Sequence, residues 1–223
     1  MGERTIILSD THLSPIMEPA RFRYLARITS RADKIFLLGD LWDCNLCTFN
    51  EFVESNWQVL FPIWQDRGAE YFEGNHDPLR LCDERVNYFS VRQHQSLDTE
   101  IGGLKLHLEH GHRIVRTHNP LLDWIARFRL GTDPTGYHFL RWVAPRALKV
   151  LGPWAVKFRD WGGTQKLEGI ARQDPDRIFV CGHTHAAVLD LKNRYANCGF
   201  VDFGWGQYLL IENGEIRLIQ ERY

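Results

Sequence analysis

The chain has 223 residues, of which 44% are hydrophobic and 25% are charged, and its net charge is −1. These ordinary globular values exclude disordered and collagen-like classes, and the length suits a single domain over residues 1–223 with a sizeable core. No apolar run approaches the roughly 20 residues of a membrane span, and five Cys, an odd number, predict reduced thiols, so we expect a cytoplasmic protein.

The first 80 residues alternate between strand and helix patterns. One helical pattern starts at Pro19, which suits the first turn of a helix, and another starts at Asn50, whose side chain can cap it. Pro62 should break the second helix, because its ring removes a backbone hydrogen bond. Short apolar runs predict buried strands at 5–8, 34–38 and 70–72. This alternation predicts parallel strands joined by right-handed crossovers.

The second half contains two hairpin patterns and one further buried strand. Residues 96–110 form two runs around a Gly-Gly pair, and residues 208–219 form two runs around an Asn-Gly pair, both typical of hairpin turns. An apolar run at 178–180 predicts a strand between these hairpins.

Residues 113–165 interrupt this regular pattern. Gly and Pro punctuate short helical stretches there, and half of the eight Trp lie within it. From Arg113 to Asp160 there are nine Lys or Arg and three Asp or Glu, a local net charge of +6 that leaves −7 for the rest of the chain. We interpret the segment as a helical insertion, or cap, that offers a basic surface to an anionic partner. The alternative is that its aromatic residues pack a small core of their own.

Metal-ligand residue types follow five of the predicted strands. Each alone has an ordinary structural explanation, since an Asp after a strand commonly caps a helix. Because the carboxyl ends of parallel strands meet at one edge of a sheet, however, the five places together predict a site. The residues are Asp10 with His12, Asp40, Asn75 with His76, His110, and His183 with His185.

The mixture of carboxylate, amide and imidazole groups indicates a transition-metal site. Such donors suit Mn, Fe, Zn or Co better than Ca, and Mn²⁺ is the ion that we expect. Two metals about 3.5–4 Å apart can hold the attacking and leaving oxygens of a phosphoryl transfer, and they lower the pKa of a bound water to about 7. The number of donors therefore matches binuclear hydrolysis of a phosphoester.

This set of motifs resembles the calcineurin-like metallophosphoesterase superfamily. The resemblance implies an α/β fold, a four-layer αββα sandwich with the site at the C-terminal ends of its strands. In this chain the sandwich would carry the helical cap insertion at about 113–165. The matching motifs are Asp10-x-His12, Gly39-Asp40, Gly74-Asn75-His76-Asp77, His110 and Gly182-His183-x-His185.

The resemblance also implies a role for each residue. His76 would contact the substrate phosphate, together with Asn75, and would protonate the leaving oxygen, while Asp77 would orient His76. Asp40 would bridge two divalent metal ions. The ligands would be Asp10, His12, Asp40 and His185 for one metal, and Asp40, Asn75, His110 and His183 for the other.

Within the superfamily, the chain resembles UDP-2,3-diacylglucosamine hydrolases in its size, its insertion and its Gly-Asp-Leu-aromatic-acid pattern at 39–43. Those enzymes split the pyrophosphate of a lipid A precursor into UMP and an acylated sugar phosphate. The resemblance implies a lipid-linked small-molecule substrate and a peripheral contact with the inner membrane through the basic aromatic cap. The chain departs from that family at His76, where the family typically carries Arg.

Other interpretations differ in substrate or in chemistry. Protein Ser/Thr phosphatases of the superfamily follow the central Gly-Asp with an Asp-Arg-Gly turn, which Leu41-Trp42-Asp43 does not match. A nuclease or general phosphodiesterase would use the same metals, but the near-neutral charge disfavours nucleic acid as a partner. A non-catalytic metal-binding module is the remaining alternative, which the complete ligand set disfavours.

Overall fold

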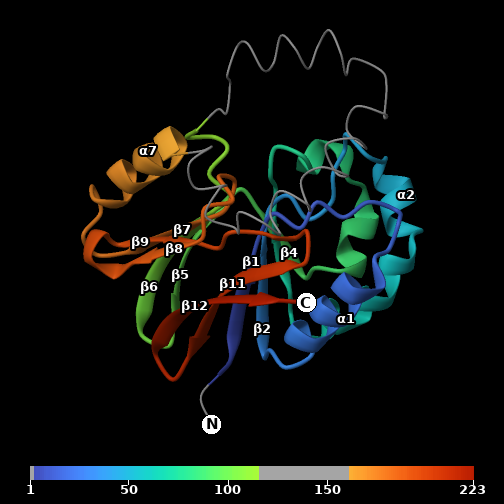
Figure 1. The fold of residues 1–223 in the computed structure, drawn as a ribbon, viewed down its shortest axis with the longest axis horizontal. Coiled ribbons are helices and arrows are strands. Elements are labelled where there is room, and N and C mark those ends of the chain that lie inside the picture. Colours follow the sequence, from blue (N-terminus) through green and yellow to red (C-terminus); the bar gives the residue numbers. More distant parts are fainter. Residues whose placement is uncertain (1–2, 116–160) are drawn as a thin grey trace, which may run out of the picture.

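The computed structural model describes residues 3–115 and 161–223, in two sheets with helices on both outer sides (Figure 1). The predicted insertion at 113–165 lies mostly outside the described residues. The helices α1 (Pro19–Thr29), α2 (Phe49–Val53) and α3 (Phe61–Asp66) lie beside one sheet, and α7 (Trp161–Ala171) lies beside the other. The arrangement is the predicted four-layer αββα sandwich.

The larger sheet has seven strands in the order β10-β11-β1-β2-β3-β4, with β12 paired to β11. Its neighbours from β1 to β4 are parallel, and β11 pairs antiparallel with β1, β10 and β12. Its strands are β1 (Thr5–Leu8), β2 (Lys34–Leu38), β3 (Glu70–Phe72), β4 (Arg92–His94), β10 (Val201–Asp202), β11 (Trp205–Glu212) and β12 (Glu215–Arg222).

The smaller sheet has five strands in the order β5-β6-β7-β9-β8. The pairs β6–β7 and β7–β9 are parallel, whereas β5–β6 and β8–β9 are antiparallel. Its strands are β5 (Ser96–Ile101), β6 (Leu104–Glu109), β7 (Ile178–Cys181), β8 (Val188–Asp190) and β9 (Tyr195–Asn197). Short 3-10 helices fill connections at η1 (Asn56–Leu60), η2 (Leu79–Leu81), η3 (Glu84–Tyr88) and η4 (Leu191–Asn193).

Three apolar layers hold the four structural layers together, because successive side chains of a strand point to opposite faces. Ile6 and Leu37 face α1–α3, while Ile7 and Phe36 face the second sheet. On the outer side of that second sheet, Phe179 packs with residues of α7. Strands β1 and β2 are therefore buried on both faces, as their continuous apolar runs predict.

The predicted strands and both hairpins are present, with changes at some boundaries. Thr48, not Asn50, caps α2: it forms a capping box in which its side chain accepts from the backbone of Glu51 and the Glu51 carboxylate accepts from the backbone of Thr48. The expected break near Pro62 is confirmed, since η1 separates α2 from α3 and Pro62 lies in the first turn of α3.

Two further findings bear on the sequence-based expectations. All five Cys lie among the described residues and are free thiols. No helix in ranges 3–115 and 161–223 has the length and apolar character needed to cross a bilayer.

Candidate metal centre

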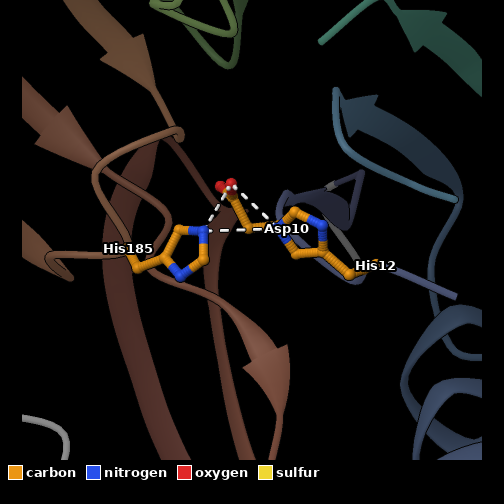
Figure 2. A group of neighbouring side chains, drawn as sticks. All are labelled: Asp10, His12 and His185. Carbon is orange, nitrogen blue, oxygen red and sulfur yellow. Dashed lines mark hydrogen bonds and ion pairs between the residues drawn. The ribbon is translucent and has the colours of Figure 1, made fainter. Parts of the chain in front are cut away.

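The first group of candidate ligands consists of Asp10, His12 and His185, which converge from two different sheets (Figure 2). Oδ1 of Asp10 lies 3.1 Å from Nε2 of His185 and 3.9 Å from Nε2 of His12, and these two ring nitrogens are 3.3 Å apart. The other Asp10 oxygen accepts hydrogen bonds from Ser9 Oγ and the His183 backbone. Oδ1 is buried and faces the ring nitrogens of His185 and His12, so these three atoms surround the space that a cation would fill.

The second group consists of Asp40, His110 and His183, with Asn75 beside it. Nε2 of His110 lies 3.3 Å from Oδ2 of Asp40 and 3.3 Å from Oδ1 of Asn75. The three residues of the group are buried. Asn75 thus presents an amide oxygen to the same point as the carboxylate.

Asp40 connects the two groups. Its Oδ2 lies 3.3 Å from Nε2 of His110 and 3.7 Å from Nε2 of His12, so one oxygen faces a ligand candidate of each group. Its Oδ1 accepts a hydrogen bond from the backbone N–H of His76 at 2.9 Å, which fixes the orientation of the carboxylate. This is the geometry that a bridging ligand requires.

Backbone carbonyls set the orientation of two of the imidazoles. His110 Nδ1 lies 2.9 Å from the Leu38 carbonyl, and His183 Nε2 lies 2.8 Å from the Val115 carbonyl. A carbonyl can only accept, so each of these nitrogens carries a proton, and the opposite nitrogen of each ring is the one available to a metal once it is unprotonated.

The backbone at the strand ends is itself unusual. Five of the candidate ligands adopt positive φ angles, which are uncommon for residues other than glycine. The values are 53° for Asp10, 42° for His12, 53° for Asp40, 67° for His183 and 55° for His185. Such turns point consecutive side chains in different directions, which explains how His183 and His185 reach different groups.

Two glycines make room for these carboxylates. A side chain at Gly74 would overlap the carboxylate of Asp40, and one at Gly182 would overlap Ser9 and the carboxylate of Asp10. Neither glycine has a positive φ, so close approach to the carboxylate is what requires glycine at both positions.

Neighbouring histidine charges keep the Asp10 carboxylate ionised. Burial raises the pKa of Asp10, but the charges of His185 and His110 outweigh it and lower that pKa to about 2. Burial lowers the pKa of His110, but Asp40 and Asp10 raise it to about 10. Burial and the His110 charge lower the pKa of His183 to about 4, so His183 is a neutral donor.

His76 lies next to the first group, with its ring centroid 4.8 Å from that of His12. Its Nδ1 lies 3.1 Å from Oδ1 of Asp43 and 2.8 Å from the side-chain amide of Asn45. Burial opposes the charged form of His76, but the Asp43 hydrogen bond and the Asp40 charge raise its pKa to about 9. A protonated His76 at neutral pH is what a general acid needs.

The expected orienting contact from Asp77 to His76 is corrected by the structure. The Asp77 carboxylate instead accepts hydrogen bonds from three backbone N–H groups, those of Asp40 at 2.9 Å, Leu41 at 2.6 Å and Gly74 at 2.7 Å. Asp77 therefore ties the loop after β2 to the loop after β3 and holds Asp40 in place. Asp43 makes the contact that sequence reasoning gave to Asp77.

Asp43 is a candidate site residue that the sequence alone does not indicate. It is fully buried, and its Oδ2 lies 3.3 Å from Nδ1 of His12 while Oδ1 contacts His76. Asp43 is the acid of the Gly-Asp-Leu-aromatic-acid pattern at 39–43, but the pattern alone indicates a subfamily and not a contact with two histidines.

The structure thus brings together all seven predicted ligands, and the donor set fits two divalent transition metals. Each group combines carboxylate and imidazole donors, and Oδ1 of Asp10 faces the first group. In His110 and His183, one ring nitrogen bonds to a backbone carbonyl, as is usual for histidines that bind metal through the other nitrogen. That these residues bind metal remains a prediction. A binuclear centre would use Asp40 as the shared ligand.

Comparison with known proteins identifies the family. A model of the calcineurin-like phosphoesterases matches residues 3–187. The chain belongs to the calcineurin-like phosphoesterase family. No curated protein matches the chain.

Several solved structures are similar to this one at low sequence identity. A single mutant of Vps29 from Entamoeba histolytica has 13% identity and a TM-score of 0.49, with 99% of both chains covered. The phosphoesterase YfcE from E. coli has 16% identity and a TM-score of 0.48, with 98% of both chains covered. Wild-type Vps29 from Entamoeba histolytica, solved with Zn²⁺, has 14% identity and a TM-score of 0.45 over 98% of both chains.

Proposed function

We propose that this calcineurin-like phosphoesterase hydrolyses a phosphodiester or pyrophosphate bond with two divalent metal ions, Mn²⁺ by preference, and that its substrate is an acylated nucleotide sugar such as UDP-2,3-diacylglucosamine. The observation that carries the binuclear chemistry is the position of Asp40 Oδ2, 3.3 Å from His110 Nε2 and 3.7 Å from His12 Nε2. A carboxylate shared in this way supports two neighbouring cations.

The bound metals would supply a hydroxide at neutral pH and charge to stabilise the transition state. Proton donation and phosphoryl binding fall to the side chains of the protein. His76 donates a proton to the leaving oxygen, and Asp43 keeps that imidazole charged and correctly turned. Asn75 binds the phosphoryl group and the metal through its amide, beside His110.

Support for an acylated substrate comes from exposed apolar side chains in two connections that follow site-bearing strands and at the start of α7. Ile16 is 72% exposed in the connection after β1, Leu81 is 43% exposed in η2 after β3, and Trp161 is 58% exposed at the start of α7. Exposed apolar groups near a polar site are typical of a surface that binds an apolar ligand. The basic composition of 113–160 supports a substrate presented at an anionic membrane surface.

Trp42 does not belong to this surface. Its side chain is 1% exposed and packs against Phe49 and Phe52 in the core beneath α2. The aromatic position of the 39–43 pattern therefore serves packing, and the Asp of the pattern serves the site.

The test is an assay of UMP release from UDP-2,3-diacylglucosamine with Mn²⁺, run beside bis-p-nitrophenyl phosphate and single-stranded DNA. The matched control is Asp40→Asn, which should be inactive on every substrate. UMP release that requires Asp40 supports the proposal. Turnover of bis-p-nitrophenyl phosphate without UMP release would reject the lipid substrate and leave a general phosphodiesterase, and turnover of DNA would indicate a nuclease. Mn²⁺ binding without any turnover would indicate a non-catalytic module.

A further inference from the structure

His112 is a histidine beside the metal centre that the proposed mechanism does not use. Its ring centroid lies 5.5 Å from that of His110 and 6.4 Å from that of His183, so it packs against both imidazoles of the second group. It belongs to none of the candidate ligand groups among the described residues. His112 thus borders the second metal position without being placed to bind the ion.

Nδ1 of His112 is buried and forms no hydrogen bond within residues 3–115 and 161–223. A buried polar atom without a partner is unfavourable, and native proteins retain few of them. At the border of a phosphoesterase site, a phosphoryl oxygen is the partner whose chemistry fits an imidazole N–H.

The turn that carries His112 is held in place by the site itself. Backbone N–H groups of Ile114 and Val115 both bond to the Gly111 carbonyl, at 3.1 and 3.0 Å. The Val115 carbonyl in turn accepts from His183, and the His110 carbonyl accepts from the Gly182 N–H. The position of His112 is therefore fixed relative to His110 and His183 before any ligand arrives, which favours a contact of defined geometry.

The two non-ligand histidines lie at opposite ends of the array. His76 packs against His12 of the first group, and His112 packs against His110 and His183 of the second. We propose that His112 hydrogen-bonds, through Nδ1, a phosphoryl oxygen of the substrate at the end of the site away from His76. This inference rests on the proposed function, since it requires a phosphoryl group at the metals.

The experiment measures binding of inorganic phosphate to the Mn²⁺-loaded protein by calorimetry, with metal content and kinetics on bis-p-nitrophenyl phosphate measured in parallel. His112→Leu should raise the phosphate Kd about 10-fold or more, because one charge-assisted hydrogen bond is lost, and should lower kcat/KM mainly through KM. His112→Asn places an amide N–H near the position of Nδ1 and should recover most of the affinity, whereas His112→Gln, which reaches the position of Nε2, should not.

The control is His107→Gln, which changes a histidine on β6 that pairs with Asp98 away from the centre. It should leave phosphate binding and metal content unchanged. Loss of one metal ion from His112→Leu would make His112 a ligand and overturn the proposal, as would equal phosphate affinity in all the variants and the wild type. If His112→Leu fails to fold, equal affinity of His112→Asn and His112→Gln overturns it. Failure of the proposed function is distinct, because the wild type would then bind phosphate without turnover.

Discussion

The buried Asp43 carboxylate pairs with the partly exposed imidazole of His76, with Oδ1 of Asp43 3.1 Å from Nδ1 of His76. The second Asp43 oxygen faces His12, so one side chain supports both the general acid and a candidate metal ligand. The pair therefore connects proton transfer to metal binding.

Replacing Asp43 with Asn should shift the alkaline limb of the pH profile. The Asp43 hydrogen bond is the largest influence that raises the pKa of His76, so its loss lowers that pKa and the acid deprotonates at lower pH. We expect kcat/KM at neutral pH to fall about 10–100-fold, as for other residues that orient metal ligands. A pH series of kcat/KM checks this, and an alkaline limb at the wild-type pH would contradict the role of Asp43.

His76→Ala should lower kcat by about 10²–10⁴-fold, the usual contribution of a positioned general acid. Both metals should remain, because His76 lies outside the two proposed ligand sets. Metal content by atomic absorption and kcat on bis-p-nitrophenyl phosphate provide the measurement. Should the variant lose a metal instead, His76 would be a ligand and not the acid.

Asp40→Asn should abolish activity and weaken the binding of both metals, because Oδ2 faces His12 of one group and His110 of the other. Calorimetric titration with Mn²⁺ separates the two binding events. Weakening of a single event would make Asp40 a terminal ligand of one metal.

Metal affinity should rise with pH across the neutral range. Asp40 and Asp10 raise the pKa of His110 to about 10, so this ligand must lose a proton before it binds a cation. Each proton released makes the apparent affinity about tenfold tighter per pH unit below that pKa. Titration with Mn²⁺ between pH 6 and pH 8 in buffers of different ionisation enthalpy counts the protons directly, and a pH-independent affinity would contradict the assignment.

Gly182→Ala should cost both stability and metal binding. The added methyl group would meet Ser9 and the carboxylate of Asp10, so either the turn or the ligand must move. The matched control is Gly169→Ala in α7, where a methyl group meets no atom within 4 Å and helix propensity favours Ala by about 0.5–1 kcal/mol. Thermal unfolding with and without Mn²⁺ compares them, and equal behaviour of the two variants would reject the packing argument.

The positions of the main strands and the convergence of the candidate ligands could be predicted from the sequence because both depend on local patterns. The run 35–38 is apolar and ends at Gly39-Asp40, so its burial and its position at a sheet edge follow from neighbouring residues alone. The partners of Asp77 and Asp43 could not be predicted, since they depend on how two loops from different strands face each other. The N-terminus of α2 at Thr48 could have been predicted, because its capping box with Glu51 is a local sequence signal.

The positive φ angles of the candidate ligands lower the stability of the protein at the positions that its proposed function needs. Of the eight non-glycine residues with positive φ among the described residues, five are candidate ligands, and each such conformation carries about 1–3 kcal/mol of strain. Glycine or asparagine would relieve that strain at these positions but would lose the ligand atom. Substitutions that relieve the strain would therefore remove candidate ligands, and the buried sheets on either side must supply the stability that these turns cost.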